Sequence, residues 1–138
     1  MYLTRSGGEK KMIKGVESIL LGSQNAKKLA DFYRDVIGLK VTMEAEVGEN
    51  NDEFFIFEMK SGSALIVIDH SKVKGKNDSP ERYILNFEVD DIDKESKRLD
   101  GLKVKKIQDK YHVEDYGFIV TYEDPDGNFF QLVQVREK

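Results

Sequence analysis

Residues 18–41 read SILLGSQNAKKLADFYRDVIGLKV, and residues 84–104 read ILNFEVDDIDKESKRLDGLKV. Each stretch runs from an apolar strand through a polar capping position and a helical pattern to the tetrapeptide GLKV. The second copy is three residues shorter, which is nearly one helical turn. Because strand, cap, helix, glycine stop and strand recur in the same order, we interpret the chain as an internal repeat of one structural unit.

The first copy carries the signals of a helix at both of its ends. Apolar residues recur at three- and four-residue spacing over residues 26–37, as on the buried face of a helix. Ser23 or Asn25 supplies a side chain of the type that caps a helix N-terminus. Gly38 can take the left-handed conformation that ends a helix, and Gly101 stands at the same place in the second copy.

Three further strands are predicted after each helix. They lie at about residues 39–46, 53–60 and 63–69 in the first half and 102–108, 117–123 and 128–135 in the second. The turn DPDGN, residues 124–128, introduces the last strand, since Pro125 presets φ and Gly127 accepts a positive φ. The order βαβββ occurs twice, so we expect an α+β fold with antiparallel-rich sheets that carry helices on one face.

The length of the chain favours one domain, and the composition of its first residues sets them apart from that domain. The chain has 138 residues, which is typical of a single domain with a real core. Residues 1–12 are polar, contain two adjacent glycines and differ from the rest, so we expect a flexible leader or an expression remnant there. We predict a single domain over residues 13–138, made of modules at about 13–74 and 82–136.

Charge and composition exclude several classes of protein. The net charge is −4 with both signs interleaved, whereas nucleic-acid-binding proteins normally show a basic face. No apolar run approaches the roughly 20 residues that span a bilayer. The chain has no cysteine, which rules out disulfides and thiolate ligands and is typical of the cytosol. We therefore expect a cytoplasmic protein that binds neither nucleic acid nor membranes.

Three motifs, in this order, resemble the vicinal oxygen chelate superfamily. They are DFYRDVIGLKV at residues 31–41, NFEVDDID at 86–93 and EDPDGNFFQLVQ at 123–134. The superfamily includes glyoxalase I, bleomycin-resistance proteins, fosfomycin-resistance enzymes and extradiol dioxygenases, and the resemblance covers residues 14–136. It implies the glyoxalase/bleomycin resistance/dioxygenase fold, in which two βαβββ modules form a curved, cup-like sheet, and it implies a homodimer.

The resemblance also implies a divalent metal held by His, Glu or Gln side chains of the first, fourth, fifth and eighth strands. Carried over position by position, these places fall on Ser18, on or near Ile66, on Ile84 and on Gln131. Isoleucine has no ligand atom, a serine hydroxyl is a poor neutral ligand, and Gln131 offers one carbonyl oxygen. We therefore expect no metal and no other cofactor.

Strand alternation places a mixed set of side chains on the face that would line the cup. Ser18, Asn86 and Gln131 belong to this face, and Phe129 and Tyr116 are aromatic residues that could stack on a planar ligand. Tyr116 is expected in a loop beside His112. The favoured interpretation is a protein that binds a small organic molecule in the cup without the standard metal.

Two enzymatic interpretations stay open. The first is a metal-dependent enzyme, of the lactoylglutathione lyase or dioxygenase type, with ligands displaced from the expected positions. The second is a metal-independent enzyme in which His112, His70 or Glu88 acts as acid or base. His70 ends an apolar strand and is expected at the rim of the cup, and His112 is expected in a loop that overhangs it. The alternative without a catalytic role is that both histidines lie on the surface and that the Glu88 carboxylate is solvated.

Overall fold

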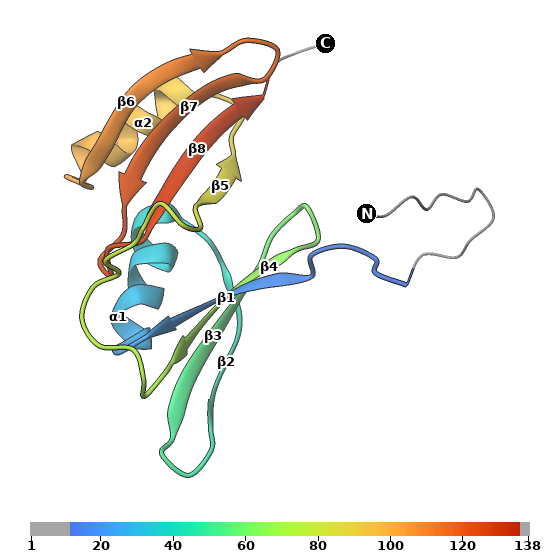
Figure 1. Cartoon of the computed structure of the whole chain (residues 1–138), viewed down its shortest axis with the longest axis vertical. Coiled ribbons are helices and arrows are strands. Elements are labelled where there is room, and N and C mark those ends of the chain that lie inside the picture. Colours follow the sequence, from blue (N-terminus) through green and yellow to red (C-terminus); the bar gives the residue numbers. More distant parts are fainter. Residues whose placement is uncertain (1–11, 136–138) are drawn as a thin grey trace, which may run out of the picture.

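The computed structural model describes residues 12–135, which form two modules that are each built on a four-stranded sheet (Figure 1). The leader predicted for residues 1–12 lies, apart from Met12, outside the described residues. No helix within residues 12–135 is long and apolar enough to cross a membrane. The α+β fold class, with βαβββ repeated twice, is confirmed.

The first module contains sheet A, whose strands lie in the order β1-β4-β3-β2. Strand β1 runs parallel to β4, and the other neighbours are antiparallel. The elements are β1 (Ser18–Ser23), α1 (Ala26–Asp31), the π-helical segment η1 (Phe32–Ile37), β2 (Val41–Val47), β3 (Asp52–Glu58) and β4 (Ala64–Asp69).

The second module repeats this plan in sheet B, with the order β5-β8-β7-β6 and one parallel pair, β5 with β8. Its elements are β5 (Leu85–Glu88), α2 (Ile92–Gly101), β6 (Lys106–Val113), β7 (Gly117–Glu123) and β8 (Phe129–Val135). The corresponding strand order in the two sheets is the structural form of the sequence repeat.

The first helix begins and ends at the predicted residues. The Asn25 side chain accepts a hydrogen bond from the Lys28 backbone N–H at 3.1 Å, and Gly38 has a φ of 95°. The second half of this helical segment is wound more widely than an α-helix. There the Gly38 N–H donates to the carbonyl of Tyr33, five residues earlier, at 3.1 Å, whereas an α-helix bonds residues four apart. The helical segment thus carries a π-turn that the sequence periodicity does not reveal.

The last strand of each module also caps the helix of that module. Asp69, at the end of β4, accepts a hydrogen bond from the Ala26 N–H at 2.8 Å. Gln134, near the end of β8, accepts one from the Ile92 N–H at 2.8 Å. Both bonds satisfy a backbone donor that the first turn of a helix leaves free. The two modules therefore resemble each other also in how the start of their helix is capped.

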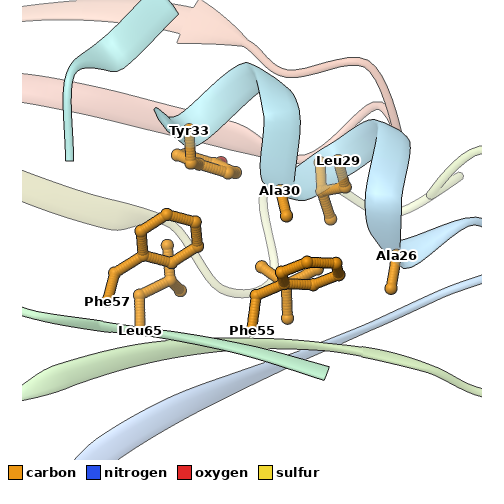
Figure 2. Close-up of a cluster of buried hydrophobic side chains, with 8 residues drawn as sticks. Ala26, Leu29, Ala30, Tyr33, Phe55, Phe57 and Leu65 are labelled. Carbon is orange, nitrogen blue, oxygen red and sulfur yellow. The ribbon is translucent and has the colours of Figure 1, made fainter. Parts of the chain in front are cut away.

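The first core lies between α1 and sheet A (Figure 2). Leu29 and Tyr33 point from the helical segment toward Phe55, Phe57 and Leu65 of the sheet, and all five are at most 3% exposed. Burial of large apolar side chains is the main stabilising term of such a layer. The core fixes α1 on one face of sheet A and leaves the other face free of helices.

Phe130 of β8 joins the two modules. Its ring lies 5.9 Å from that of Phe32 and 6.2 Å from that of Tyr33, both in the first module. It also lies 6.0 Å from the Phe87 ring and 5.8 Å from the Tyr122 ring in the second module. Edge-to-face and stacked rings at these separations attract each other beyond the effect of burial.

A buried hydrogen bond strengthens the same junction. The Tyr33 hydroxyl donates to Asp124 at 2.6 Å, and Asp124 also accepts from the backbone N–H groups of Asp126 and Asn128 and from the Asn128 side chain. Burial raises the pKa of the Asp124 carboxyl, against the effect of these donors. Burial and the neighbouring carboxylate hold the pKa of Tyr33 well above its usual value.

One strand differs clearly from its prediction. The sixth strand was expected at residues 102–108, but β6 runs from Lys106 to Val113. Two register irregularities, between Lys106 and Gln108 and between Gln108 and Tyr111, let a polar stretch stay paired with β7. His112 therefore lies in a strand rather than in an overhanging loop.

Candidate functional site

Each sheet has a helix face and an open face. In β4, Leu65 and Val67 are buried against the first helix, and Ile66 and Ile68 point to the opposite side. In β5, Leu85 and Phe87 pack toward the helices as predicted, and the intervening residues are exposed. The open faces are the surfaces on which the candidate binding residues lie.

Two rows of directly paired residues cross the open face of sheet A, and we call them the apolar rows. The first is Leu20, Ile66, Ile56 and Met43, and the second is Gly22, Ile68, Phe54 and Ala45. Leu20 is 58% exposed and Met43 is 55% exposed. Neither row contains a polar side chain, so this part of the open face offers only apolar contact to whatever covers it.

A different row crosses the open face of sheet B, and we call it the polar row. It consists of Asn86, Gln131, Thr121 and Gln108, paired directly across all four strands. The Gln131 side-chain nitrogen donates to the Thr121 hydroxyl at 2.9 Å. The row provides uncharged donors and acceptors on adjacent strands, which is the arrangement that orients a ligand in a largely apolar pocket.

A hollow of about 440 Å³ lies over three of the four residues of the polar row. This volume falls within the usual range for small-molecule sites. The row contributes Gln108, Thr121 and Gln131 to its lining. The remaining lining residues are Glu81, Ile84, Ile107, Tyr111 and Phe129.

The predicted ligand-binding residues fall into three places. Asn86 and Gln131 belong to the polar row, and Phe129 lines the hollow beside it. Ser18 lies on the open face of the other sheet, paired with Ala64. Tyr116 lies in the turn between β6 and β7, where its N–H donates to the Val113 carbonyl at 3.0 Å.

Two residues of the polar row were not selected from the sequence. Thr121 lies between two buried residues of β7, Val120 and Tyr122, so alternation would have placed it on the open face. Gln108 had no such signal, because it follows a register irregularity that changes the alternation in β6.

The two histidines do not meet in one chain. The His112 ring lies 4.8 Å from that of Phe118, its strand partner, and Phe118 shares the helix side of β7 with Val120 and Tyr122. His70 follows β4 in the other sheet, where its Nδ1 accepts from the Lys72 N–H at 3.1 Å. A His70–His112 couple within a single chain is therefore not formed.

Glu88 is the remaining predicted acid–base candidate. It lies on β5, two residues beyond Asn86 and paired with Val133, so it shares the open face with the polar row. Its side chain is exposed. The structure thus places this carboxylate on the open face of sheet B but not among the residues that line the hollow, and a catalytic role for it stays a prediction.

The sequence matches the glyoxalase/bleomycin resistance protein/dioxygenase superfamily over residues 15–132. The chain belongs to this superfamily. No curated protein sequence matches it. The match confirms the family that the three sequence motifs indicated.

Several solved structures share the superfamily fold with this chain. A glyoxylase/bleomycin resistance protein/dioxygenase domain from Frankia sp. EAN1pec has a TM-score of 0.74 and 16% identity, over 90% of this chain and 99% of that one. TnmS3, an antibiotic binding protein from Streptomyces sp. CB03234, has a TM-score of 0.73 and 21% identity, over 92% and 100%. The fosfomycin resistance protein FosX from Listeria monocytogenes has a TM-score of 0.71 and 16% identity, over 91% and 96%.

The residues at the implied metal positions of the superfamily do not fit a divalent metal. Ile66 and Ile84 carry no donor atom, and Ser18 and Gln131 offer neutral oxygens from different sheets. Across residues 12–135, no group of three or more His, Cys, Asp or Glu side chains is arranged to hold a metal ion. The side chains at the four implied positions offer neutral hydrogen bonding and apolar contact.

Proposed function

We propose that this superfamily member binds a small organic molecule over the polar row and does so without the standard divalent metal. The observation that carries the proposal is the hollow of about 440 Å³ in which hydrogen-bonding side chains adjoin aromatic and aliphatic ones. The antibiotic-binding protein TnmS3, which shares the fold, is consistent with such a role. A cytoplasmic location remains the expectation from the sequence.

Metal analysis combined with ligand screening tests this function. Protein produced without a tag in medium supplemented with Ni, Zn, Mn and Fe is expected to retain less than about a tenth of an equivalent of any of them. Compounds from a small-molecule library are expected to raise the melting temperature equally with and without EDTA, because the polar row needs no metal.

Two matched variants locate the binding. Gln131→Leu removes the centre of the polar row and is expected to abolish the ligand-induced rise in melting temperature. Asn50→Leu makes a comparable change in the exposed turn between β2 and β3 and is expected to leave the rise intact. Close to one equivalent of metal, together with loss of ligand binding in EDTA, would instead support a metal-dependent enzyme with displaced ligands.

We also propose that the protein acts as a homodimer in which a second copy covers the apolar rows. Leu20, Ile56 and Met43 belong to one row, and the row beside it is also apolar, so the two rows form a continuous apolar surface on the open face of sheet A. Contiguous apolar surface of this kind usually marks an interface. The open face of sheet B in the partner is the surface that we pair with it, because the polar row would then be enclosed.

Light scattering checks the dimer. Leu20→Lys is expected to convert the protein to a monomer at micromolar concentration, because a lysine ammonium in an apolar interface loses hydration without a partner. Since Leu20 is 58% exposed in one chain, the variant is expected to stay folded. Glu44→Lys, on the opposite face of β2, is the control and should remain dimeric. A monomeric wild-type protein would refute the proposal.

A further inference from the structure

The hydrogen bond between Thr121 and Gln131 determines what the centre of the polar row offers to a ligand. The Gln131 amide nitrogen donates to the Thr121 hydroxyl at 2.9 Å. A hydroxyl that accepts one bond still has its proton to donate, and an amide that donates still has its carbonyl oxygen to accept. Within residues 12–135, no other side-chain hydrogen bond uses either group. The centre of the row therefore presents a hydrogen-bond donor beside an acceptor.

The two groups address the same edge of a ligand. Thr121 of β7 and Gln131 of β8 are directly paired, so their side chains leave the sheet on one side, with Cβ atoms about 4.5 to 5.5 Å apart. Both line the hollow, although Thr121 is only 5% exposed. A ligand that satisfies both groups must carry an acceptor and a donor next to each other.

This requirement holds for either orientation of the Gln131 amide. If the amide is rotated by half a turn, the Thr121 hydroxyl donates to the amide oxygen. The Gln131 N–H and a lone pair of the Thr121 oxygen then face the hollow. The row again presents one donor beside one acceptor, with their places exchanged.

A lactam, which is an amide within a ring, carries such an edge. The ring holds its N–H and C=O on the same side, whereas an open-chain amide is trans and directs them to opposite sides. A lactone has no donor and an ionised carboxylate has only acceptors, so each would leave one group of the row unsatisfied, which is costly away from water. A flat ring also suits the aromatic side chains of Tyr111 and Phe129 in the lining.

On the basis of the function proposed above, we infer that the ligand is a planar, uncharged ring compound with a lactam edge, as in pyridones, quinolinones and pyrimidinediones. The lactam bonds to Thr121 and Gln131, and the ring packs on Phe129. Asn86 and Gln108 flank the central pair and are exposed, so they bond to polar substituents of the ring.

Three neutral bicyclic probes of nearly equal size test the lactam edge in the wild-type protein. In 2-quinolinone the N–H and C=O are adjacent, in 4-quinolinone they lie at opposite ends of the ring, and in coumarin a ring oxygen replaces the N–H. Titration of isotope-labelled protein, followed by NMR, gives the three dissociation constants. We expect 2-quinolinone to bind at least about tenfold more tightly than either of the others, because only this probe satisfies both groups.

Two valine variants locate the preference. Thr121→Val keeps the shape of the side chain and removes the hydroxyl, so either quinolinone can then make only one of the two bonds. The advantage of 2-quinolinone over 4-quinolinone is expected to fall to within about twofold. Thr42→Val makes the same change in β2 of sheet A, where the hydroxyl donates to the Ile56 carbonyl, and should keep the full preference.

The lactam preference is refuted if 2-quinolinone does not bind, if it binds no more tightly than 4-quinolinone or coumarin, or if Thr121→Val retains its advantage. The comparison of the three probes uses the wild-type protein, so it decides the matter even if a variant does not fold. The proposed function is decided separately, by the library screen. Compounds without a lactam whose binding is lost in Gln131→Leu would sustain that function while the lactam preference fails.

Discussion

Replacing Phe130 by alanine is expected to lower the free energy of unfolding by about 3 to 5 kcal/mol. The side chain is fully buried and touches rings of both modules, so its loss leaves a cavity that neither module can close alone. Urea denaturation of wild type and variant, at one protein concentration, gives the difference.

Phe118→Ala is the matched control, because this phenylalanine lies on the neighbouring strand but is 36% exposed. Its removal is expected to cost about 1 kcal/mol, in the range of ordinary substitutions. If both variants lost the same stability, the ring contacts of Phe130 would not join the modules energetically.

Replacing Asp124 by alanine is expected to cost a similar amount, about 3 to 5 kcal/mol, because several donors lose their acceptor at about 1 to 3 kcal/mol each. Asp124 is 2% exposed and accepts hydrogen bonds from Tyr33, Asp126 and Asn128. Its removal leaves the buried Tyr33 hydroxyl and the part-buried N–H groups of the turn without their acceptor, and unsatisfied groups away from water are costly. Equilibrium denaturation is again the measurement.

Tyr33→Phe isolates one of these bonds. It removes the hydroxyl that bonds to Asp124 at 2.6 Å and leaves the donors of the turn in place. The expected cost is about 1 to 2 kcal/mol, clearly less than that of Asp124→Ala. Equal costs would mean that the turn contributes nothing and that the module junction depends on the tyrosine bond alone.

Local signals in the sequence were sufficient for the fold class and for the order of its elements. The Asn25 cap, Gly38, the DPDGN turn and, outside β6, the alternation of apolar residues act within a few positions, and they appear where they were predicted. Gly101 was expected to end the second helix as Gly38 ends the first, but Gly101 is still helical, and Lys103 takes the left-handed conformation with a φ of 65°. The same alternation placed Asn86 and Gln131 on one face, because β5 and β8 are regular. These two of the four residues of the polar row could therefore be predicted from the sequence.

The other half depends on pairing that the sequence does not display. In β6, two register irregularities reset which residues share a face, so Gln108 and Tyr111 lie on the open side and His112 on the helix side. Bulges arise from the match between two strands rather than from one strand alone. A prediction from alternation therefore fails first in this strand.

The contacts that join the two modules also connect residues that are distant in the sequence. Arg98 of α2 donates to the carbonyl of Val36 at 2.8 Å and to that of Ile37 at 3.1 Å, across more than 60 positions of the chain. The Phe130 cluster joins segments that lie still farther apart in the sequence. No local sequence pattern indicates either contact. The relative placement of the two modules could therefore not be predicted from the sequence.

The caps that Asp69 and Gln134 supply to the helices also constrain the order of events during synthesis. Each bond spans more than 40 residues, from the last strand of a module back to its first helix turn. A nascent helix on the ribosome stays without this partner until its whole module has emerged. We expect each module to gain its stability in one late step, the first when Asp69 leaves the exit tunnel and the second only with Gln134.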